Sequence, residues 1–256
     1  MAVPYFIWNG VDSRDMGVVV VKYPAIVLPT ERAETVSIPG RPGFLTRTEG
    51  SGIYDGYLKT IEIGNRRWAD ARAISAWLRG SGTLILGSEP DYAYEARVLK
   101  EASIDRVFGG VYSGTVAFMV QPGKAQVPPE SDIVITGASA TIYNPGDLPA
   151  RPIYRLTGSG RMILSVTPLS TYSQLVVNPI DTGWESTLTG AVIDTDAMIA
   201  TTPDGTGNLN EITTIYYNGV SGLWIPPKAS VTVSGAVSDE EGSVTQVIVT
   251  PRWRWL

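Results

Sequence analysis

The sequence of 256 residues contains no cysteine and no histidine. Without cysteine the chain has no disulfide, no thiolate nucleophile and no thiolate metal site. Without histidine it lacks the commonest general base and the commonest metal ligand. Hydrolases built on a Ser-His-Asp triad, zinc peptidases of the zincin type and non-haem iron enzymes are therefore excluded. We expect no enzyme activity, no cofactor and no metal.

Charged residues are also scarce. They make up 18% of the chain, below the usual level of about 25%, whereas hydrophobic residues make up 43%. The net charge is −5 and the basic residues are scattered, which argues against binding of nucleic acid through its phosphates. A lightly charged surface indicates that part of it is covered in the working state.

Long apolar runs are missing as well. The longest, such as Val18 to Val21, fall far short of the roughly 20 residues that a membrane helix needs. The first residues hold no basic segment followed by an apolar stretch. We therefore expect no secretion signal, no membrane insertion and synthesis in the cytoplasm.

What the chain does have is many turns between short apolar runs. With 27 glycines and 18 prolines, this pattern favours an all-β architecture. In the first half, short strands are predicted at 18–21, 84–86 and 116–120. Apolar and charged side chains alternate from Tyr92 to Val98, which predicts a half-buried strand because successive strand residues point to opposite faces.

One segment of the first half has helical periodicity. Apolar residues recur every three or four positions from Trp68 to Leu78, Asn65 can cap the start, and Gly80 follows the end. This pattern predicts one amphipathic helix over about 66–79, packed on a sheet.

A proline-rich connector divides the chain. The two consecutive prolines at 128 and 129 fix backbone angles and remove amide donors, so we expect a stiff linker over 123–131. It separates a first domain, 1–122, from a second, 132–256. In the second domain, short apolar runs between turn signals predict a β-sandwich, with strands at 140–143, 153–156, 162–166, 175–177, 191–193, 212–217, 231–233 and 244–249.

The stretch over about 30–56 differs from the rest of the first domain. Charged residues alternate with apolar ones, and Gly40-Arg41-Pro42-Gly43 forms a turn near its middle. We interpret it as a long hairpin arm, which is marginally stable in water unless another surface covers it. Folding back on its own domain is the simpler alternative to contact with a partner. The candidate contact residues are Glu34, Val36, Ile38, Arg41, Phe44, Leu45 and Arg47.

Two alternatives arise in the second domain. Aromatic faces stack on sugars, so Trp184, Tyr217 and Trp224 are candidate glycan contacts, although Tyr and Trp fill β cores more often. Paired carboxylates could cleave glycosides, but the candidates lie in or beside turns, where such residues are ordinary. These candidates are Asp181, Glu185, Asp194, Asp196 and Glu211.

Several segments, taken in order, resemble the distal tail protein family of bacteriophages with long non-contractile tails. Single motifs are weakly specific, whereas their order and spacing extend over nearly the whole chain. In the first half they are 9–13, 17–20, 38–43, 74–84, 88–92 and 114–122. In the second half they are 144–146, 150–152, 158–160, 224–226 and 251–253.

The resemblance implies a mainly β fold, with an N-terminal β domain carrying one α-helix and the hairpin arm, and a C-terminal galectin-like β-sandwich. It also implies a structural protein of the virion tail tip, made in the host bacterial cytoplasm. Such a protein forms a homo-hexameric ring, single or as two stacked rings, and leaves a channel through which DNA passes without specific binding. The implied partners are the major tail tube protein, the tail-associated hub or fibre protein and the receptor-binding apparatus. A carbohydrate-binding module is the alternative function.

Overall fold

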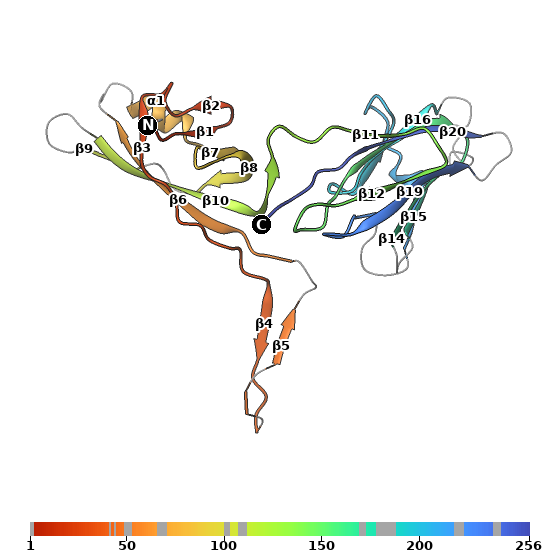
Figure 1. Ribbon diagram of the computed structural model, residues 1–256, viewed down its shortest axis with the longest axis horizontal. Coiled ribbons are helices and arrows are strands. Elements are labelled where there is room, and N and C mark those ends of the chain that lie inside the picture. The colour runs from red at the N-terminus through yellow and green to blue at the C-terminus, as the bar shows by residue number, and fades with distance from the viewer. Residues whose placement is uncertain are drawn as a thin grey trace. The chain divides into compact units, whose positions relative to one another are not determined.

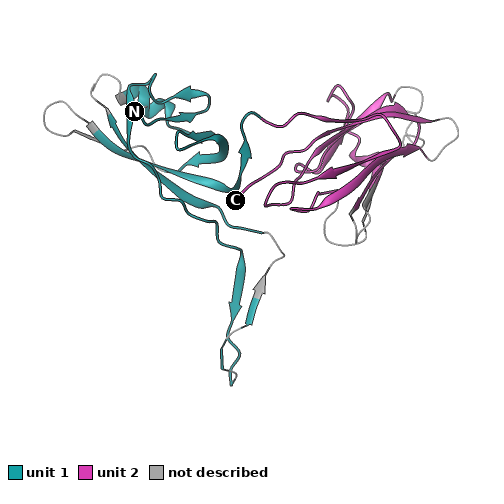
Figure 2. Ribbon diagram, viewed as in Figure 1, with its two compact units in different colours: residues 1–128, 256 teal, residues 129–255 magenta. Residues whose placement is uncertain are grey.

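The computed structural model describes residues 3–40, 42–43, 45–48, 53–65, 71–99, 103–106, 112–168, 173–177, 188–217, 223–237 and 242–256. The chain divides into two compact units (Figure 2). The first contains residues 1–128 with the last residue, and the second contains residues 129–255. Within the described residues, no helix is both long and apolar enough to cross a membrane.

The first unit is built on one antiparallel sheet (Figure 1). Its strands lie in the order β2-β1-β7-β8-β10-β6-β3, and β9 also pairs with β10. Strands far apart in the sequence therefore lie side by side, such as β1 and β7. The bounds are β1 Phe6–Trp8, β2 Val11–Asp12, β3 Val18–Lys22, β6 Tyr57–Asn65, β7 Ser81–Leu86, β8 Glu89–Val98, β9 Ser103–Arg106 and β10 Tyr112–Gln126.

The helix α1, Ala71–Trp77, supplies apolar side chains to the core of this unit. Ile74 is buried among residues of β1, β6 and β10, and the Trp77 ring stacks on Phe6 with ring centroids 5.4 Å apart. The predicted helix is confirmed over 71–77, and its first residues, 66–70, lie outside the described part. The predicted alternation in β8 is also confirmed, because Tyr94 and Ala96 are buried while Glu95 and Arg97 are exposed.

The connector starts later than the sequence predicted. Residues 123–126 were expected to belong to the linker, but they form the last part of β10, and residues 124–126 pair with Tyr92 to Tyr94 of β8. The register shifts between Val120 and Lys124, where Gly123 has a φ of 95°. The Pro-Gly sequence thus makes a bulge instead of ending the strand.

The second unit contains two antiparallel sheets of five strands. One has the order β11-β20-β13-β16-β17 and the other the order β12-β19-β14-β15-β18. The bounds are β11 Ile133–Ile135, β12 Ser139–Tyr143, β13 Ile153–Ser159, β14 Met162–Pro168, β15 Ser173–Val177, β16 Gly190–Asp194, β17 Ile199–Thr201, β18 Thr213–Tyr217, β19 Ser230–Val237 and β20 Ser243–Thr250. A short 3₁₀ turn, η3 Asn210–Ile212, precedes β18.

The two sheets share one core, so this unit is a β-sandwich. Leu156 and Val247 from one sheet and Leu164 and Val233 from the other belong to the same buried cluster. Every strand predicted for this half is present, with small shifts at the ends, whereas β11 and β17 were not predicted. The mainly β fold class is therefore confirmed.

Candidate assembly interface

The predicted arm contains two short strands that pair only with each other. Strand β4, Ala33–Val36, runs antiparallel to β5, Leu45–Thr48, and the pair forms a separate two-stranded sheet, which we call the ribbon (Figure 1). In the register Val36 lies opposite Leu45, and Glu34 lies opposite Arg47. Directly opposed residues share a face of an antiparallel pair, so the register places an aliphatic pair on one face of the ribbon.

Both faces of β4 are open to solvent. All four of its residues are exposed, and the opposed aliphatic side chains of Val36 and Leu45 are 40% and 43% exposed. Ile38, two residues beyond Val36, is exposed to a similar extent. The ribbon does not fold back on its own unit. The structure therefore differs from the simpler alternative, in which the arm packs on its own domain.

The base of the ribbon is held by hydrogen bonds and one ion pair. The Arg32 amide donates to the Ile53 carbonyl at 2.8 Å, and the Asp55 amide donates to the Thr30 carbonyl at 2.9 Å. The Arg32 guanidinium also meets the Asp55 carboxylate at 2.9 Å. These contacts fix where the ribbon leaves the sheet, but the ion pair is exposed and weakly stabilising.

For four of the seven predicted contact residues, the structure describes both the backbone and the side chain. Glu34, Val36, Ile38 and Leu45 are all exposed on the ribbon or just beyond it. Arg47 is described for its backbone pairing alone. Arg41 and Phe44 lie outside the described residues, and their contacts stay predictions.

An exposed apolar surface that the sequence did not single out lies beside the ribbon base. We call it the apolar strip: Val21 at the end of β3, Ile26 and Leu28 after it, and Leu58 on β6, each more than half exposed. The chain on both sides of it is paired, Lys22 with Glu62 and Thr30 with Asp55. Residues 23–30 therefore run alongside residues 55–61 between these two paired ends (Figure 1).

A buried lysine lies on the opposite face of the same stretch of β6. Lys59 is 4% exposed, and its ammonium group lies 4.6 Å from the ring centroid of Tyr94 and 5.6 Å from that of Tyr57. The Tyr94 hydroxyl donates a hydrogen bond to the Glu89 carboxylate, which also meets Lys124 at 3.5 Å. Lys59, Tyr57, Tyr94, Glu89 and Lys124 thus form a charged and aromatic cluster at this end of the core.

This cluster shifts the pKa values of its members in different directions. Burial lowers the pKa of Lys59, and the nearby Glu89 only partly opposes that effect. Burial and the hydrogen bond to Glu89 raise the pKa of Tyr94. For Glu89, burial acts to raise the pKa, but the hydrogen bond from Tyr94 and the charges of Lys124 and Lys59 outweigh it, so the pKa lies below its usual value. Lys59 lies two residues before Ile61 and four before Ile63, so the two-residue period of a strand predicts that all three side chains point to the buried face. This sequence pattern could have identified Lys59 as a buried residue.

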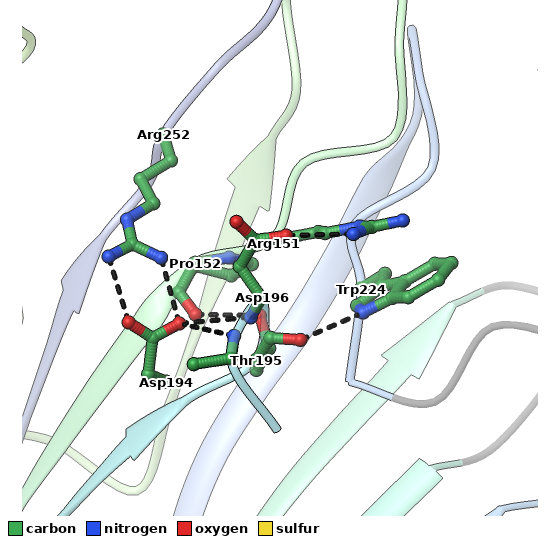
Figure 3. A network of polar contacts seen from close by, with 8 residues as sticks. Arg151, Pro152, Asp194, Thr195, Asp196, Trp224 and Arg252 are labelled. Atoms are coloured by element: carbon green, nitrogen blue, oxygen red, sulfur yellow. Dashed lines mark hydrogen bonds and ion pairs between the residues drawn. The ribbon is translucent and has the colours of Figure 1, made fainter. Parts of the chain in front are cut away.

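The candidate glycan contacts of the sandwich do not form a described site. Trp184 lies outside the described residues, and of Tyr217 only the backbone is described. The Trp224 indole donates to the Thr195 carbonyl at 3.4 Å, and the Arg151 guanidinium lies 4.2 Å from its ring centroid (Figure 3). One face of this indole is therefore already occupied by Arg151, which itself meets Asp196 at 2.7 Å.

Two of the candidate carboxylates of the sandwich, Asp194 and Asp196, form ion pairs with arginines of the same unit. The Arg252 guanidinium donates two hydrogen bonds to Asp194, at 2.8 and 2.9 Å (Figure 3). Burial acts to raise the pKa of Asp194, but these bonds and two backbone amides outweigh it and lower the pKa. Asp181 and Glu185 lie outside the described residues. Within the described residues, no group of three or more acidic side chains is placed to hold a metal ion.

Comparison with known proteins gives a match in structure but not in sequence. No protein-family model matches the chain, and no curated protein matches it. The crystal structure of the SPP1 Dit protein, described as a paradigm of the hub adsorption apparatus in Gram-positive infecting phages, has a TM-score of 0.71 and is 17% identical. The match covers 98% of this chain and 99% of that chain. The match therefore shows the fold of the chain.

A second solved structure is a fructofuranosidase from Schwanniomyces occidentalis, with a TM-score of 0.21 and 8% identity over 86% of this chain and 59% of that chain. This likeness is too weak to carry an argument.

Proposed function

We propose that this chain is a structural protein of a phage tail tip, which assembles with copies of itself into a hexameric ring. The ring joins the tail tube to the hub or fibre protein and the receptor-binding apparatus, and its central channel lets DNA pass. The role is mechanical, and no catalytic step is assigned to the chain.

The observation that carries the proposal is the ribbon. It presents the opposed aliphatic residues Val36 and Leu45 to solvent, although a two-stranded sheet with no covered face is marginally stable in water. A second copy of the chain would cover that face. The full-length likeness to the SPP1 Dit protein supports a tail-tip role for such an assembly.

The charge of the chain fits a DNA channel. With a net charge of −5 and scattered basic residues, the protein would repel the DNA backbone weakly and would not hold it. The carbohydrate-binding alternative has less support, because one face of Trp224 is already stacked on Arg151.

The test is the mass of the assembled wild-type protein. Native mass spectrometry at micromolar concentration should give a hexamer or a dimer of hexamers, and negative-stain electron microscopy should show a ring with a central hole. Val36→Asp should give a folded monomer, because an interface cannot accept an unpaired charge without a large loss of affinity. A wild-type protein that stays monomeric at every attainable concentration would refute the proposal.

A further inference from the structure

The last residues of β10 are held by a single neighbouring strand. Strand β10 pairs with β6 as far as Val120. Beyond the bulge, residues 124–126 pair with β8, and within the described residues no strand pairs with them on their other side. The contact with β8 ends at Val127, whose amide donates to the Asp91 carbonyl at 2.8 Å. We call residues 124–127 the clasp, because a strand end with one neighbour opens more readily than a strand that is held on both sides.

Chain that cannot continue the strand ladder bounds the clasp on both sides. Before it, Gly123 has a φ of 95°, which residues with a side chain rarely adopt, and Pro122 has no amide to donate. After it come Pro128 and Pro129, which also lack the amide hydrogen. The pairing of the clasp with β8 is therefore a short patch that can open separately from the main part of β10.

A buried charge without an ion pair lies beside the clasp. Lys59 is 4% exposed, and within the described residues its ammonium group faces the rings of Tyr94 and Tyr57 but forms no ion pair. Lys124 of the clasp lies opposite Tyr94 in the register. Burial lowers the pKa of Lys59, and the positive charge of Lys124 acts in the same direction, whereas Glu89 opposes both. The closed clasp thus keeps two like charges close together, with one of them out of water.

The side-chain contacts that hold the clasp closed are weak. The Lys124 ammonium group meets the Glu89 carboxylate at 3.5 Å, and both side chains are partly exposed. The same ammonium group lies 4.8 Å from the ring centroid of Tyr92. Ion pairs and cation–π contacts that water can reach stabilise a structure only slightly. Release would also separate the two lysines and let water reach Lys59, so the loss of these contacts is partly offset.

We propose that the clasp detaches from β8 while the rest of the first unit stays folded, and that its release lengthens the connector to the second unit. With the clasp closed, the connector consists of residues 128–132, because β11 begins at Ile133. Release adds residues 124–127, about 13 Å of extended chain. A longer connector widens the range over which the second unit can meet a partner. The clasp acts within one copy of the chain, so it operates with or without the ring.

The first test measures trypsin cleavage of the folded full-length protein after Lys124. No lysine or arginine lies between Ala125 and Ala150, so a fragment that begins at Ala125 reports release of the clasp. Lys59→Met should slow the formation of this fragment by on the order of tenfold, because it removes the buried charge that favours release. Lys22→Met is the matched control at a lysine whose side chain is 73% exposed, and it should leave the rate unchanged.

A core variant separates release of the clasp from unfolding of the whole unit. Ile74 on α1 is fully buried in the core, so Ile74→Val should raise the population of unfolded protein several-fold. Cleavage after Lys124 should nevertheless stay at the wild-type rate, because release leaves that core intact. Cleavage that rises in Ile74→Val in proportion to global unfolding, or that is unchanged in Lys59→Met, would overturn the inference.

The second test closes the clasp with a covalent bond. Ala93 of β8 lies directly opposite Ala125, and the chain has no cysteine. The double variant Ala93→Cys with Ala125→Cys should therefore form one disulfide on oxidation. Cleavage after Lys124, read after the reaction is quenched and reduced, should be slower by more than about tenfold in the oxidised protein than in the reduced protein. Equal cleavage of the two forms, or failure of the disulfide to form, would show that the bond is not cut through release of the clasp from β8.

Discussion

The ribbon β4–β5 and the strand pair β14–β15 of the sandwich use the same local arrangement with opposite results. In each, two aliphatic residues lie directly opposite one another: Val36 and Leu45 in the ribbon, Leu164 and Leu175 in the sandwich. The sandwich pair is fully buried against the facing sheet, and the ribbon pair is exposed. Cross-strand pairing alone therefore does not make a strand pair stable, because its stability comes mainly from the surface that covers one of its faces.

The comparison is tested most strongly by truncating one leucine in each pair. Leu175→Ala should lower the free energy of unfolding by about 2–5 kcal/mol, because it leaves a cavity in the sandwich core. Leu45→Ala should change it by less than about 0.5 kcal/mol in the monomer, because the side chain is exposed and its loss leaves no cavity in a packed core. Denaturant unfolding of both variants at concentrations too low for assembly measures the difference. Equal losses would show that the ribbon is packed on its own chain.

The two regions also differ in their ion pairs. Asp194 and Arg252 in the sandwich are partly buried and joined by two hydrogen bonds. Asp194→Asn should cost about 1–3 kcal/mol at neutral pH. The folded pKa of Asp194 is lowered, so its contribution is complete above about pH 4 and is lost as the pH falls through the folded value. Unfolding free energies of wild type and variant should therefore converge in acid, and a constant gap would contradict this assignment.

Lys59 lies where the packed core ends and the ribbon begins, and it should respond to pH in the opposite sense. Burial lowers its folded pKa, so the unfolded chain binds the proton more readily and wild-type stability should rise with pH toward about 10. Lys59→Met should be more stable than wild type at neutral pH by on the order of 1 kcal/mol. Denaturant unfolding as the pH rises from neutral toward about 10 should show that this advantage narrows, whereas an advantage that grows with pH would refute the interpretation.

The smallest effect is expected at the ribbon base. Asp55→Asn removes the exposed ion pair with Arg32 and should change the free energy of unfolding by less than about 0.5 kcal/mol. The change should shrink further in high salt, because exposed charges are screened. Thermal unfolding at low and high ionic strength measures it. A loss comparable with that of Asp194→Asn would mean that the base of the ribbon is more deeply packed than its exposure indicates.

Local patterns were sufficient to predict most strands and the ribbon. The alternation from Tyr92 to Val98 defines β8 because burial follows the two-residue period, and the charged and apolar alternation around the Gly40 turn defines β4 and β5. Both features depend on neighbours in sequence, which is the information that a single sequence carries most directly.

Features that depend on long-range packing were not predictable in the same way. The pairing of β1 with β7 joins residues more than 70 positions apart, and no local pattern specifies it. Pro122-Gly123 indicated a break, but β8 pairs with the chain on both sides of the bulge. The exposed residues Ile26 and Leu28 were missed because an apolar run does not show by itself whether its side chains are buried or exposed.

The central claim is that the ribbon is incomplete in one copy and is covered by the next. Hydrogen–deuterium exchange of the wild-type protein above and below its association concentration tests this claim most directly, with Val36→Asp as the monomeric reference. Amides of 33–36 and 45–48 should be strongly protected in the concentrated wild type and exchange rapidly in the dilute protein and in Val36→Asp, while β14 and β15 stay protected throughout. Equal, rapid exchange of the ribbon in all three samples, alongside a fully assembled wild type, would contradict the claim.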